Sequence, residues 1–397
     1  MPTTTSFPDG FLWGTATAAH QVEGGNWNND WWAWEHAPGT PCPDPSGDAC
    51  DHWHRYDDDI ALIANLGLST YRFSLEWSRI EPEEGEFSMV ALDHYKRMCE
   101  SCRERGIEPM VTFHHFTSPR WVAAAGGWAD AETAERFGRF VERTASHLRD
   151  SMASACTINE PNWVATNGYI LAMWPPGEAD IEKGKRASEN FVVAHRRAVE
   201  AIRAAAPGVP VGLTLSMTDF QAVEGGEKRL DEIRRAMEDV YLEGTEGDDY
   251  IGVQTYTRIL VNDKGLAPFP DGARLTLMGY EFYPDALEAC IRRAVEVTGL
   301  PVIVTENGIG TENDEERIEY VERALEGVLR TIADGLDVRG YIYWSLLDNF
   351  EWAFGYKPTF GLVAVDRSTQ VRTEKPSARW LGGVARANAL PFERRPA

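Results

Sequence analysis

Two glutamates stand at the ends of short apolar runs, and each has an asparagine beside it. The two runs read Cys156-Thr-Ile-Asn159-Glu160 and Ile303-Val-Thr-Glu306-Asn307. A carboxylate and an amide that close an apolar run, twice in one chain, form a layout suited to chemistry. Hydrolysis of a glycosidic bond requires two carboxyl groups: one protonates the leaving oxygen, and the other attacks the sugar or activates water. We therefore take Glu160 and Glu306 as the candidate catalytic pair.

The elements that must position this pair follow from the hydrophobic pattern. Short runs rich in Val, Ile and Tyr alternate with segments of helical period, as expected for βα units and a parallel sheet. We predict strands at about 11–16, 70–75, 107–113, 155–159, 210–215, 250–255, 301–305 and 340–345. Apolar residues recur at helical spacing between them, for example from Ile318 through Leu325 to Ile332. The pattern predicts an α/β fold, a single (β/α)8 TIM barrel spanning 1–397.

A barrel of this kind carries its active site at the C-terminal ends of the strands. On this prediction Glu160 ends the fourth strand and Glu306 ends the seventh, so their side chains can meet across the barrel mouth. A single glutamate at a strand end is often only structural. Two of them beside asparagines favour catalysis.

Composition restricts the class of protein further. The chain has 397 residues with a net charge of −23, no linker and no low-complexity stretch. Such a charge disfavours nucleic acid, anionic membranes and phosphorylated substrates, although it can also reflect only solubility. No apolar window approaches the roughly 18 residues of a membrane span, and no signal-peptide pattern is present at the start. We expect a cytoplasmic enzyme without nucleic-acid or membrane partners, and a homo-oligomer is compatible with the sequence.

The six cysteines are scattered and suggest no metal site. Cys99 and Cys102 form a C-x-x-C on a predicted helix, but no second pair stands at zinc-site spacing. Cys42 and Cys50 flank a Pro/Gly-rich loop and could pair under oxidation. We expect free thiols.

Five stretches together resemble the family 1 glycoside hydrolases (β-glucosidases and relatives), and the resemblance covers nearly the whole chain. The stretches are Phe11-Leu-Trp-Gly-Thr-Ala-Thr-Ala-Ala-His-Gln21-Val-Glu-Gly, Tyr71-Arg72-Phe-Ser-Leu-Glu-Trp-Ser-Arg79-Ile, Thr157-Ile-Asn159-Glu160-Pro161, Val304-Thr-Glu306-Asn307-Gly308 and Trp344-Ser-Leu-Leu-Asp-Asn-Phe-Glu351-Trp352. One such motif is moderately specific, whereas five in this order are very specific.

The resemblance implies hydrolysis with retention of configuration, with Glu306 as the nucleophile and Glu160 as the general acid and base. In retaining enzymes the two carboxyl groups lie only about 5–5.5 Å apart, so one of them stays protonated near neutral pH. The resemblance also implies that Arg72 and Tyr256 hold Glu306 ionised through hydrogen bonds. Asn159 would bind the 2-hydroxyl of the sugar.

The resemblance extends to a pocket for the nonreducing sugar. Its implied substrate-binding residues are Gln21, His115, Gln254, Trp344, Glu351 and Trp352. Trp344 would be the aromatic platform beneath the sugar, and Glu351 would bind the 4- and 6-hydroxyls and repel a 6-phosphate. His114 points to the opposite face of its strand and is left out. The carboxylates supply acid, base and nucleophile, so we expect no metal and no cofactor.

The chain departs from the family pattern at several positions. Phe116 follows His115 where the family usually has Trp, Gln254 stands where Asn is usual, and Thr359 stands where Arg is commoner. The chain is also shorter than typical members. We expect the rim loops around 26–50, 174–188 and 261–280 to govern which aglycone is accepted.

The predicted function is therefore exo-acting hydrolysis of small β-glycosides, releasing terminal glucose, with galactose and fucose as further candidate sugars. Two alternatives keep the same scaffold. An alcohol or a sugar could intercept the glycosyl-enzyme, which is transglycosylation and uses the same residues. A catalytically silent sugar-binding barrel is less compatible with an intact Glu160.

Overall fold

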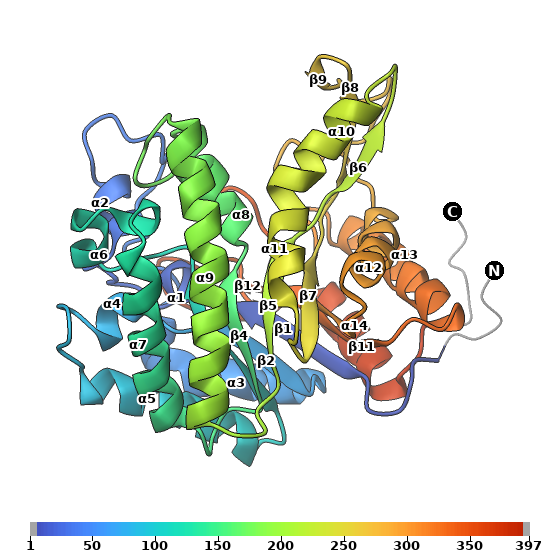
Figure 1. Cartoon of the computed structure of the whole chain (residues 1–397). Coiled ribbons are helices and arrows are strands. Elements are labelled where there is room, and N and C mark those ends of the chain that lie inside the picture. The colour runs from blue at the N-terminus through green and yellow to red at the C-terminus, as the bar shows by residue number, and fades with distance from the viewer. Residues whose placement is uncertain (1–5, 392–397) are drawn as a thin grey trace.

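The computed structural model describes residues 6–391, and eight of its strands form a closed, parallel barrel (Figure 1). The barrel strands are β1 (Leu12–Thr17), β2 (Thr70–Ser74), β3 (Glu108–His115), β4 (Ser154–Asn159), β5 (Val211–Ser216), β7 (Tyr250–Gln254), β10 (Val302–Asn307) and β11 (Val338–Trp344). Their order around the barrel is β1-β11-β10-β7-β5-β4-β3-β2, and β2 pairs with β1 to close it. All eight predicted strands and the predicted fold class are confirmed. The predicted domain limits, 1 and 397, lie outside the described residues.

Helices surround the barrel and connect its strands (Figure 1). They are α1 (Ala19–Val22), α2 (Asp30–Glu35), α3 (His52–Leu66), α4 (Trp77–Ile80), α5 (Met89–Glu104), α6 (Arg120–Ala124), α7 (Glu132–Leu148), α8 (Pro161–Trp163), α9 (Ile181–Ala205), α10 (Glu227–Arg234), α11 (Val240–Leu242), α12 (Ala286–Thr298), α13 (Asp314–Ala333) and α14 (Pro376–Ala387). A π-helical segment, η2 (Val164–Ile170), extends α8. The predicted stripe lies on α13, and Leu325 of that stripe is fully buried.

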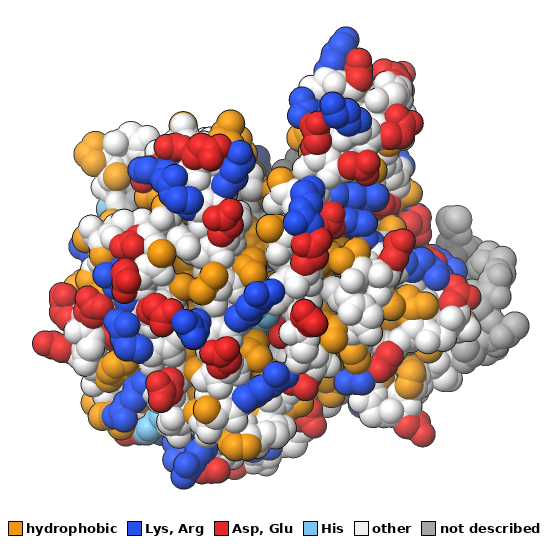
Figure 2. All heavy atoms as spheres, viewed as in Figure 1, with side chains coloured by type: hydrophobic (Ala, Val, Ile, Leu, Met, Phe, Trp, Pro, Cys, Tyr) orange, Lys and Arg blue, Asp and Glu red, His pale blue; other side chains and the backbone are white. Residues whose placement is uncertain are grey.

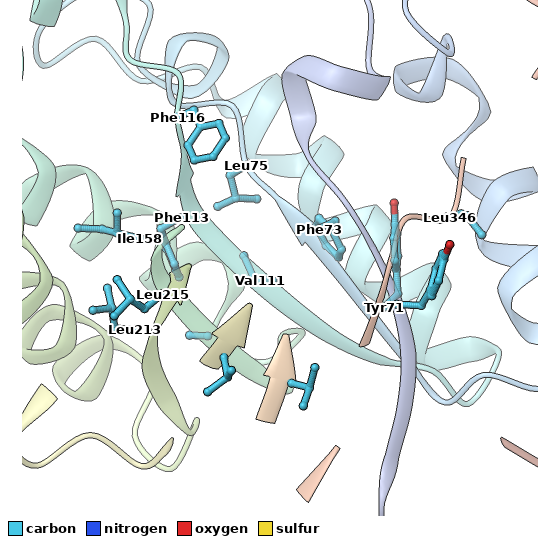
Figure 3. Close-up of a cluster of buried hydrophobic side chains, with 14 of the residues drawn as sticks. Tyr71, Phe73, Leu75, Val111, Phe113, Phe116, Ile158, Leu213, Leu215 and Leu346 are labelled. Carbon is cyan, nitrogen blue, oxygen red and sulfur yellow. The ribbon is translucent and has the colours of Figure 1, made fainter. Parts of the chain in front are cut away.

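Alternation along the strands separates two apolar regions. Outward-facing residues of the strands pack beneath the helices in the main core, among them Tyr71, Phe73, Val111, Leu213 and Leu215 (Figure 3). A second cluster includes Met110 of β3, Cys156 of β4 and Ile342 of β11. These three alternate along their strands with main-core residues, so they fill the barrel interior. The inward-facing positions at the strand ends are therefore left for polar side chains.

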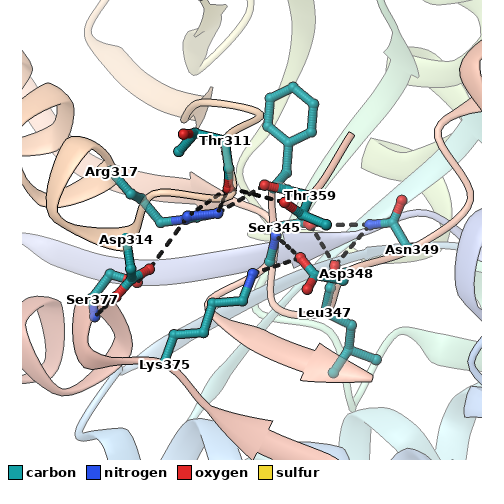
Figure 4. Close-up of polar contacts among 12 residues, drawn as sticks. Thr311, Asp314, Arg317, Ser345, Leu347, Asp348, Asn349, Thr359, Lys375 and Ser377 are labelled. Carbon is teal, nitrogen blue, oxygen red and sulfur yellow. Dashed lines mark hydrogen bonds and ion pairs between the residues drawn. The ribbon is translucent and has the colours of Figure 1, made fainter. Parts of the chain in front are cut away.

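A network of polar contacts fixes the loops that follow β10 and β11 (Figure 4). The guanidinium of Arg317 donates to the carbonyls of Thr311 (2.7 Å) and Thr359 (2.8 Å), which joins the two loops. Lys375 pairs with Asp348 at 2.8 Å. Thr359, where the sequence departs from the family pattern, thus takes part through its backbone carbonyl. The loop that carries Glu351 and Trp352 is held from both sides.

A small sheet projects beyond the barrel next to α10 (Figure 1). It consists of β6 (Asp219–Ala222), β8 (Arg258–Asn262) and β9 (Gly265–Leu266), and Phe220, Leu230 and Val261 form its own apolar cluster. A further pair, β12 (Val363–Val365) and β13 (Arg372–Glu374), lies before α14. The rim segments expected to be loops are thus partly regular, because α2 occupies part of 26–50, α9 begins at Ile181, and β8 and β9 occupy part of 261–280.

The surface bears intermingled charges rather than one acidic field on the face in Figure 2. For example, Arg292 pairs with Glu288 (2.8 Å) and with Asp334 (2.6 Å). Within residues 6–391 no helix combines the length and the apolar character needed to cross a bilayer. All six cysteines are free and buried, as predicted, and Cys42 and Cys50 do not pair.

Candidate active site

The carboxylate of Glu306, near the end of β10, receives one donor on each oxygen. Nη1 of Arg72 donates to Oε1 at 2.6 Å, and the Tyr256 hydroxyl donates to Oε2 at 2.6 Å. Arg72 is the inward-facing residue of β2, and Tyr256 lies two residues beyond β7. Burial raises the pKa of Glu306, while Arg72 and Tyr256 act to lower it. The contacts on both oxygens stabilise the ionised form.

Glu160 directly follows β4, and its backbone lies in the left-handed region (φ 44°). Its peptide N–H donates to the carbonyl of Thr214 on β5 at 2.9 Å, and Pro161 begins α8 immediately after it. Glu160 as a whole residue is 6% exposed, and its Oε1 has no hydrogen-bond partner in the protein. Burial and then the charge of Glu306 raise the pKa of Glu160 well above the usual range.

The two glutamates therefore differ in their surroundings. Glu306 contacts a cation and a phenol, whereas the same cation affects the pKa of Glu160 less than burial, Glu306 and Ser216 do. A carboxylate with a contacting guanidinium ionises more readily than a buried one without such a contact. At neutral pH this favours an ionised Glu306 and a protonated Glu160.

Asn159 connects Arg72 to the rest of the mouth. Its Oδ1 accepts from Nη2 of Arg72 (2.5 Å) and from Nε2 of Gln254 (2.9 Å). Its Nδ2 lies 3.2 Å from Nε2 of His115 and donates to it, which leaves the imidazole proton on Nδ1. Burial and then the charge of Arg72 hold the pKa of His115 well below its usual range, so the ring is neutral.

Gln21 and Glu351 meet on the opposite side of the mouth. Nε2 of Gln21 donates to the carbonyl of Phe350 (2.8 Å), to Oδ1 of Asn349 (3.0 Å) and to Oε2 of Glu351 (3.4 Å). Burial and then the charge of Glu306 raise the pKa of Glu351 to about 8, against the effect of hydrogen bonds from Gln21 and Trp344. The negative charge of Glu306 thus raises the pKa of Glu351 as well as that of Glu160.

Aromatic rings enclose these polar groups. The His115 ring lies nearly parallel to Trp344 at 5.8 Å between centroids, and to Trp352 at 6.2 Å. Trp352 also packs against Trp31 at 4.6 Å and Phe116 at 5.0 Å. Such rings offer apolar faces to the C–H surface of a pyranose.

Five polar atoms of the predicted site residues are buried without any partner in the protein. They are Oε1 of Gln21, Nε of Arg72, Nδ1 of His115, Oε1 of Glu160 and Oε1 of Gln254. A buried polar group that lacks a hydrogen bond costs about 1–3 kcal/mol. A cluster of them, both donors and acceptors, is suited to a ligand rich in hydroxyl groups.

The comparisons with known proteins agree with this geometry. The model of "Glycosyl hydrolase family 1" matches residues 3–243 and 270–390. The chain belongs to family 1 of the glycosyl hydrolases. Beta-glucosidase A of Thermotoga maritima is 32% identical, over 97% of this chain and 98% of that protein. A bifunctional beta-D-glucosidase/beta-D-fucosidase of Bifidobacterium breve is 34% identical, over 95% and 97% respectively. The crystal structure of beta-glycosidase BGL167 superposes with a TM-score of 0.91 at 50% identity, covering 98% of this chain and all of that one.

The predicted family and class of enzyme are thereby confirmed. All eleven predicted site residues of this glycosyl hydrolase lie in the barrel or in the segments that follow its strands at the carboxyl end. Gln254 and Tyr256 fall in the interval 244–269 that the family model leaves out. Gln254, expected to contact the sugar, donates to Asn159, and its free Oε1 is the atom left for a ligand.

Sequence reasoning missed Tyr280 and Ser216. Burial is the largest cause that raises the pKa of Tyr280, and the charges of Tyr320, Glu351 and Glu160 add to it, so Tyr280 lies within electrostatic range of the site. Ser216, the last residue of β5, lowers the pKa of Glu160 through a hydrogen bond and accepts from Nε1 of Trp163 at 2.8 Å. The place of Ser216 at a strand end could have indicated its role, but Tyr280 follows no barrel strand and carries no such signal. We excluded His114 from the site because it lies on the opposite face of its strand. Its ring does pack away from the site, with its centroid 5.0 Å from that of Trp128.

Proposed function

We propose that this family 1 glycosyl hydrolase is a retaining, exo-acting β-glycosidase, a β-glucosidase that also accepts β-galactosides or β-fucosides. The observation that carries the proposal is the unequal environment of the two glutamates. Glu306 has a donor on each oxygen, whereas Glu160 keeps one oxygen unpartnered and its pKa raised. The names of the relatives from Thermotoga maritima and Bifidobacterium breve support the choice of sugar.

In the first step, Glu306 attacks the anomeric carbon while Glu160 delivers its proton to the glycosidic oxygen. The bond from carbon to Glu306 forms, and the aglycone leaves as a neutral alcohol. Asn159, held by Arg72 and Gln254, would bind the sugar 2-hydroxyl, a contact that strengthens in the transition state.

In the second step the charge on Glu306 controls the pKa of Glu160. Once Glu306 is an ester it is no longer an anion, and the repulsion that raised the pKa of Glu160 disappears. Glu160 then remains ionised and takes the proton of the attacking water, which forms the hemiacetal and releases Glu306. The required separation of the two carboxyl groups, about 5–5.5 Å, stays a prediction, and oxygens ten or more ångströms apart in a crystal structure would overturn it.

Glu351 supports the preference for unphosphorylated sugars. It lies beside Gln21 and within the field of Glu306, so a 6-phosphate placed there would bring two more negative charges close to the negative charge of Glu306. Lys357, the nearest lysine in sequence, is exposed on the surface. The proposal is therefore exo-hydrolysis of neutral glycosides.

Azide rescue tests the assignment of the nucleophile. Glu306→Ala should abolish hydrolysis of 4-nitrophenyl β-glucoside, and azide should restore release of the phenol with α-glucosyl azide as product. Glu238→Ala is the matched control, because Glu238 is also buried and paired with Arg293 but lies outside the mouth. A β-azide product from the Glu306 variant would exclude Glu306 as the nucleophile. Binding without turnover by the unmodified protein would instead indicate a sugar-binding barrel.

A panel of gluco-, galacto-, fuco-, manno- and xylo-configured 4-nitrophenyl glycosides tests the choice of sugar. We expect the highest kcat/KM for the glucoside or the fucoside. Product analysis at high acceptor concentration separates hydrolysis from transglycosylation.

We also propose a single domain and a cytoplasmic location. One apolar core contains residues from Phe7 to Leu390, which supports the single domain, and six free thiols suit a reducing compartment. A single cooperative unfolding transition and recovery in the cytosolic fraction are expected. Light scattering measures whether the enzyme forms a homo-oligomer.

A further inference from the structure

A second hollow lies beside the mouth, between segments that follow three different strands. It has a volume of about 330 Å³ and is lined by Asp30, Ala33, Trp34, Ala37, Arg120, Ala123, Pro175 and Pro176. A smaller, more enclosed hollow of about 80 Å³ shares Asp30, Ala123 and both prolines with it. The larger volume is at the lower end of the range of small-molecule sites, roughly 300–1,000 Å³.

The walls of this hollow are fixed by backbone contacts. The segment before α2 pairs with the segment before α6, because the N–H of Asp30 donates to the carbonyl of Ser118 at 2.9 Å and the N–H of Arg120 donates to that of Asn28 at 3.0 Å. Figure 1 shows α2 and α6 next to each other at one edge of the molecule. Alanines on both helices leave the space open, and the Pro175–Pro176 turn closes one side.

Asp30 presents one carboxylate oxygen without a partner. Its Oδ1 accepts the peptide N–H groups of Trp31 and Ser118, each at 2.9 Å. None of the ion pairs among residues 6–391 includes Asp30. Burial, with a contribution from the charge of Glu76, raises the pKa of Asp30 to about 7 in spite of the two N–H donors. This carboxylate is therefore held in place by the fold but left uncompensated.

Arg120 lines the same hollow with an unused donor group, on an exposed side chain. The guanidinium of Arg120 makes no hydrogen bond or ion pair with another described residue, and it does not reach Asp30. Nε1 of Trp34 is buried without a partner. The ring of Trp34 is fixed by its contact with Gly177, where an added Cβ would lie 2.5 Å from Cζ3. The hollow thus combines an acceptor, one guanidinium donor and a fixed aromatic ring.

This combination selects the charge of the ligand. An anion would be repelled by Asp30 and by the net charge of −23. A cation would be repelled by Arg120 and would meet an Asp30 that is only partly ionised at neutral pH. A neutral polyol suits all the groups, because neighbouring hydroxyls can donate to a carboxylate and accept from a guanidinium while C–H groups pack on the indole.

A wall of aromatic rings separates this hollow from the catalytic mouth. Trp31, next to Asp30 in the chain, contacts Trp352 at 4.6 Å and Trp174 at 5.4 Å between centroids. Trp174 in turn contacts Phe116 at 4.8 Å. No residue that lines the hollow belongs to the eleven predicted site residues.

We propose that the hollow bounded by Asp30, Trp34 and Arg120 is a second binding site, specific for a neutral saccharide such as a free hexose. It lies on the same face of the barrel as the catalytic mouth, so it can hold a released sugar or a distal unit of a longer glycoside. The inference rests on the lining groups and does not depend on which glutamate is the nucleophile.

NMR of the indole N–H groups tests the site directly. The signal of Trp34 is identified by its loss in Trp34→Phe, and D-glucose is titrated into the otherwise unmodified protein. We expect a saturable shift of the Trp34 signal at millimolar glucose. Propylamine hydrochloride and sodium phosphate, at equal ionic strength, should leave the signal unmoved. A shift with either ion instead of glucose would overturn the ligand class.

Three variants localise the effect. Ala33→Phe fills the hollow from the exposed face of α2 and should abolish the Trp34 shift but keep any shift of Trp344 in the catalytic mouth. Ala204→Phe, on the exposed face of α9, is its control. Asp30→Asn keeps the Oδ1 acceptor and should weaken glucose binding at least fivefold, whereas Asp58→Asn should not.

The outcomes separate this proposal from the catalytic one. Absence of any Trp34 shift, or a shift that survives Ala33→Phe, would refute the second site. Either result leaves the azide experiment unaffected, since that experiment reports only on Glu306.

Discussion

Replacement of Tyr256 by phenylalanine should move the acidic side of the pH profile upward. The hydroxyl of Tyr256 donates to Oε2 of Glu306 at 2.6 Å and helps to lower the pKa of that carboxyl group. The phenylalanine keeps the ring against Phe360 but removes the donor. Since the hydrogen bond stabilises only the ionised form, its loss must raise the pKa of Glu306.

The size of the shift follows from the strength of one hydrogen bond to a charged group. Such a bond contributes about 1.5–3 kcal/mol, and about 1.36 kcal/mol corresponds to one pKa unit. We therefore expect the acidic limb to move up by about 1–2 pH units. The active form needs an ionised Glu306 and a protonated Glu160. The variant therefore loses activity as the pH falls, and its pH range of full activity narrows from the acidic side.

The assay is kcat/KM for 4-nitrophenyl β-glucoside as a function of pH, which reports the free enzyme. Because the two glutamates interact, the limb gives an apparent pKa of the pair. Tyr241→Phe is the control: Tyr241 is a buried tyrosine whose hydroxyl donates to Ser188 at 2.8 Å, away from the mouth. An acidic limb that stays within 0.3 units of the unmodified enzyme, or one that moves equally in Tyr241→Phe, would refute the reasoning.

Four further expectations follow from the same structure. Glu306→Gln removes the charge that raises the pKa of Glu160, so the ¹³C titration of the Glu160 carboxyl should shift to lower pH. Glu351→Gln should reduce kcat/KM for the β-glucoside at least fivefold more than for the β-xyloside, which lacks the 6-hydroxymethyl group; equal losses would remove Glu351 from the 6-hydroxyl contact. Dialysis against EDTA should leave kcat unchanged, and a large loss that zinc or magnesium restores would count against a mechanism carried by carboxylates alone. Leu325→Ala, at a fully buried position of α13, should lower the free energy of unfolding in urea by about 2–5 kcal/mol, while Leu266→Ala, 66% exposed, should cost almost nothing.

The part of the site that the sequence predicted best is the part set by strand ends. The run up to Glu160 and the run up to Glu306 are each apolar and bounded by a polar pair, and the chain alternates regularly between strands and helices. In a parallel barrel every strand ends at the same face, so the type and order of elements already bring the two glutamates to one mouth. Periodicity is a local property, and it therefore survives in a single sequence.

The contacts that give the two glutamates different pKa values depend on residues far apart in the chain. The guanidinium of Arg72 contacts both Glu306 and Asn159. Gln254, which we expected to contact the sugar, donates to Asn159. Tyr280, whose pKa the charges of Glu351 and Glu160 help to raise, belongs to a segment without a strand-end signal. No local pattern encodes which inward-facing side chains of β2, β4, β7 and β10 meet, because their distances depend on the register and closure of the whole barrel.

By itself the sequence determined the eight strands, the face on which they end and the two carboxyl groups that end there. The family resemblance already implied that Arg72 holds Glu306, and the tertiary structure supplied the distances of that contact and showed that Asp30, Trp34 and Arg120 surround a separate hollow. The physical reason is that hydrophobic period and strand-end residues are local, whereas the pKa of a buried carboxyl depends on charges and donors that only the folded chain brings within a few ångströms.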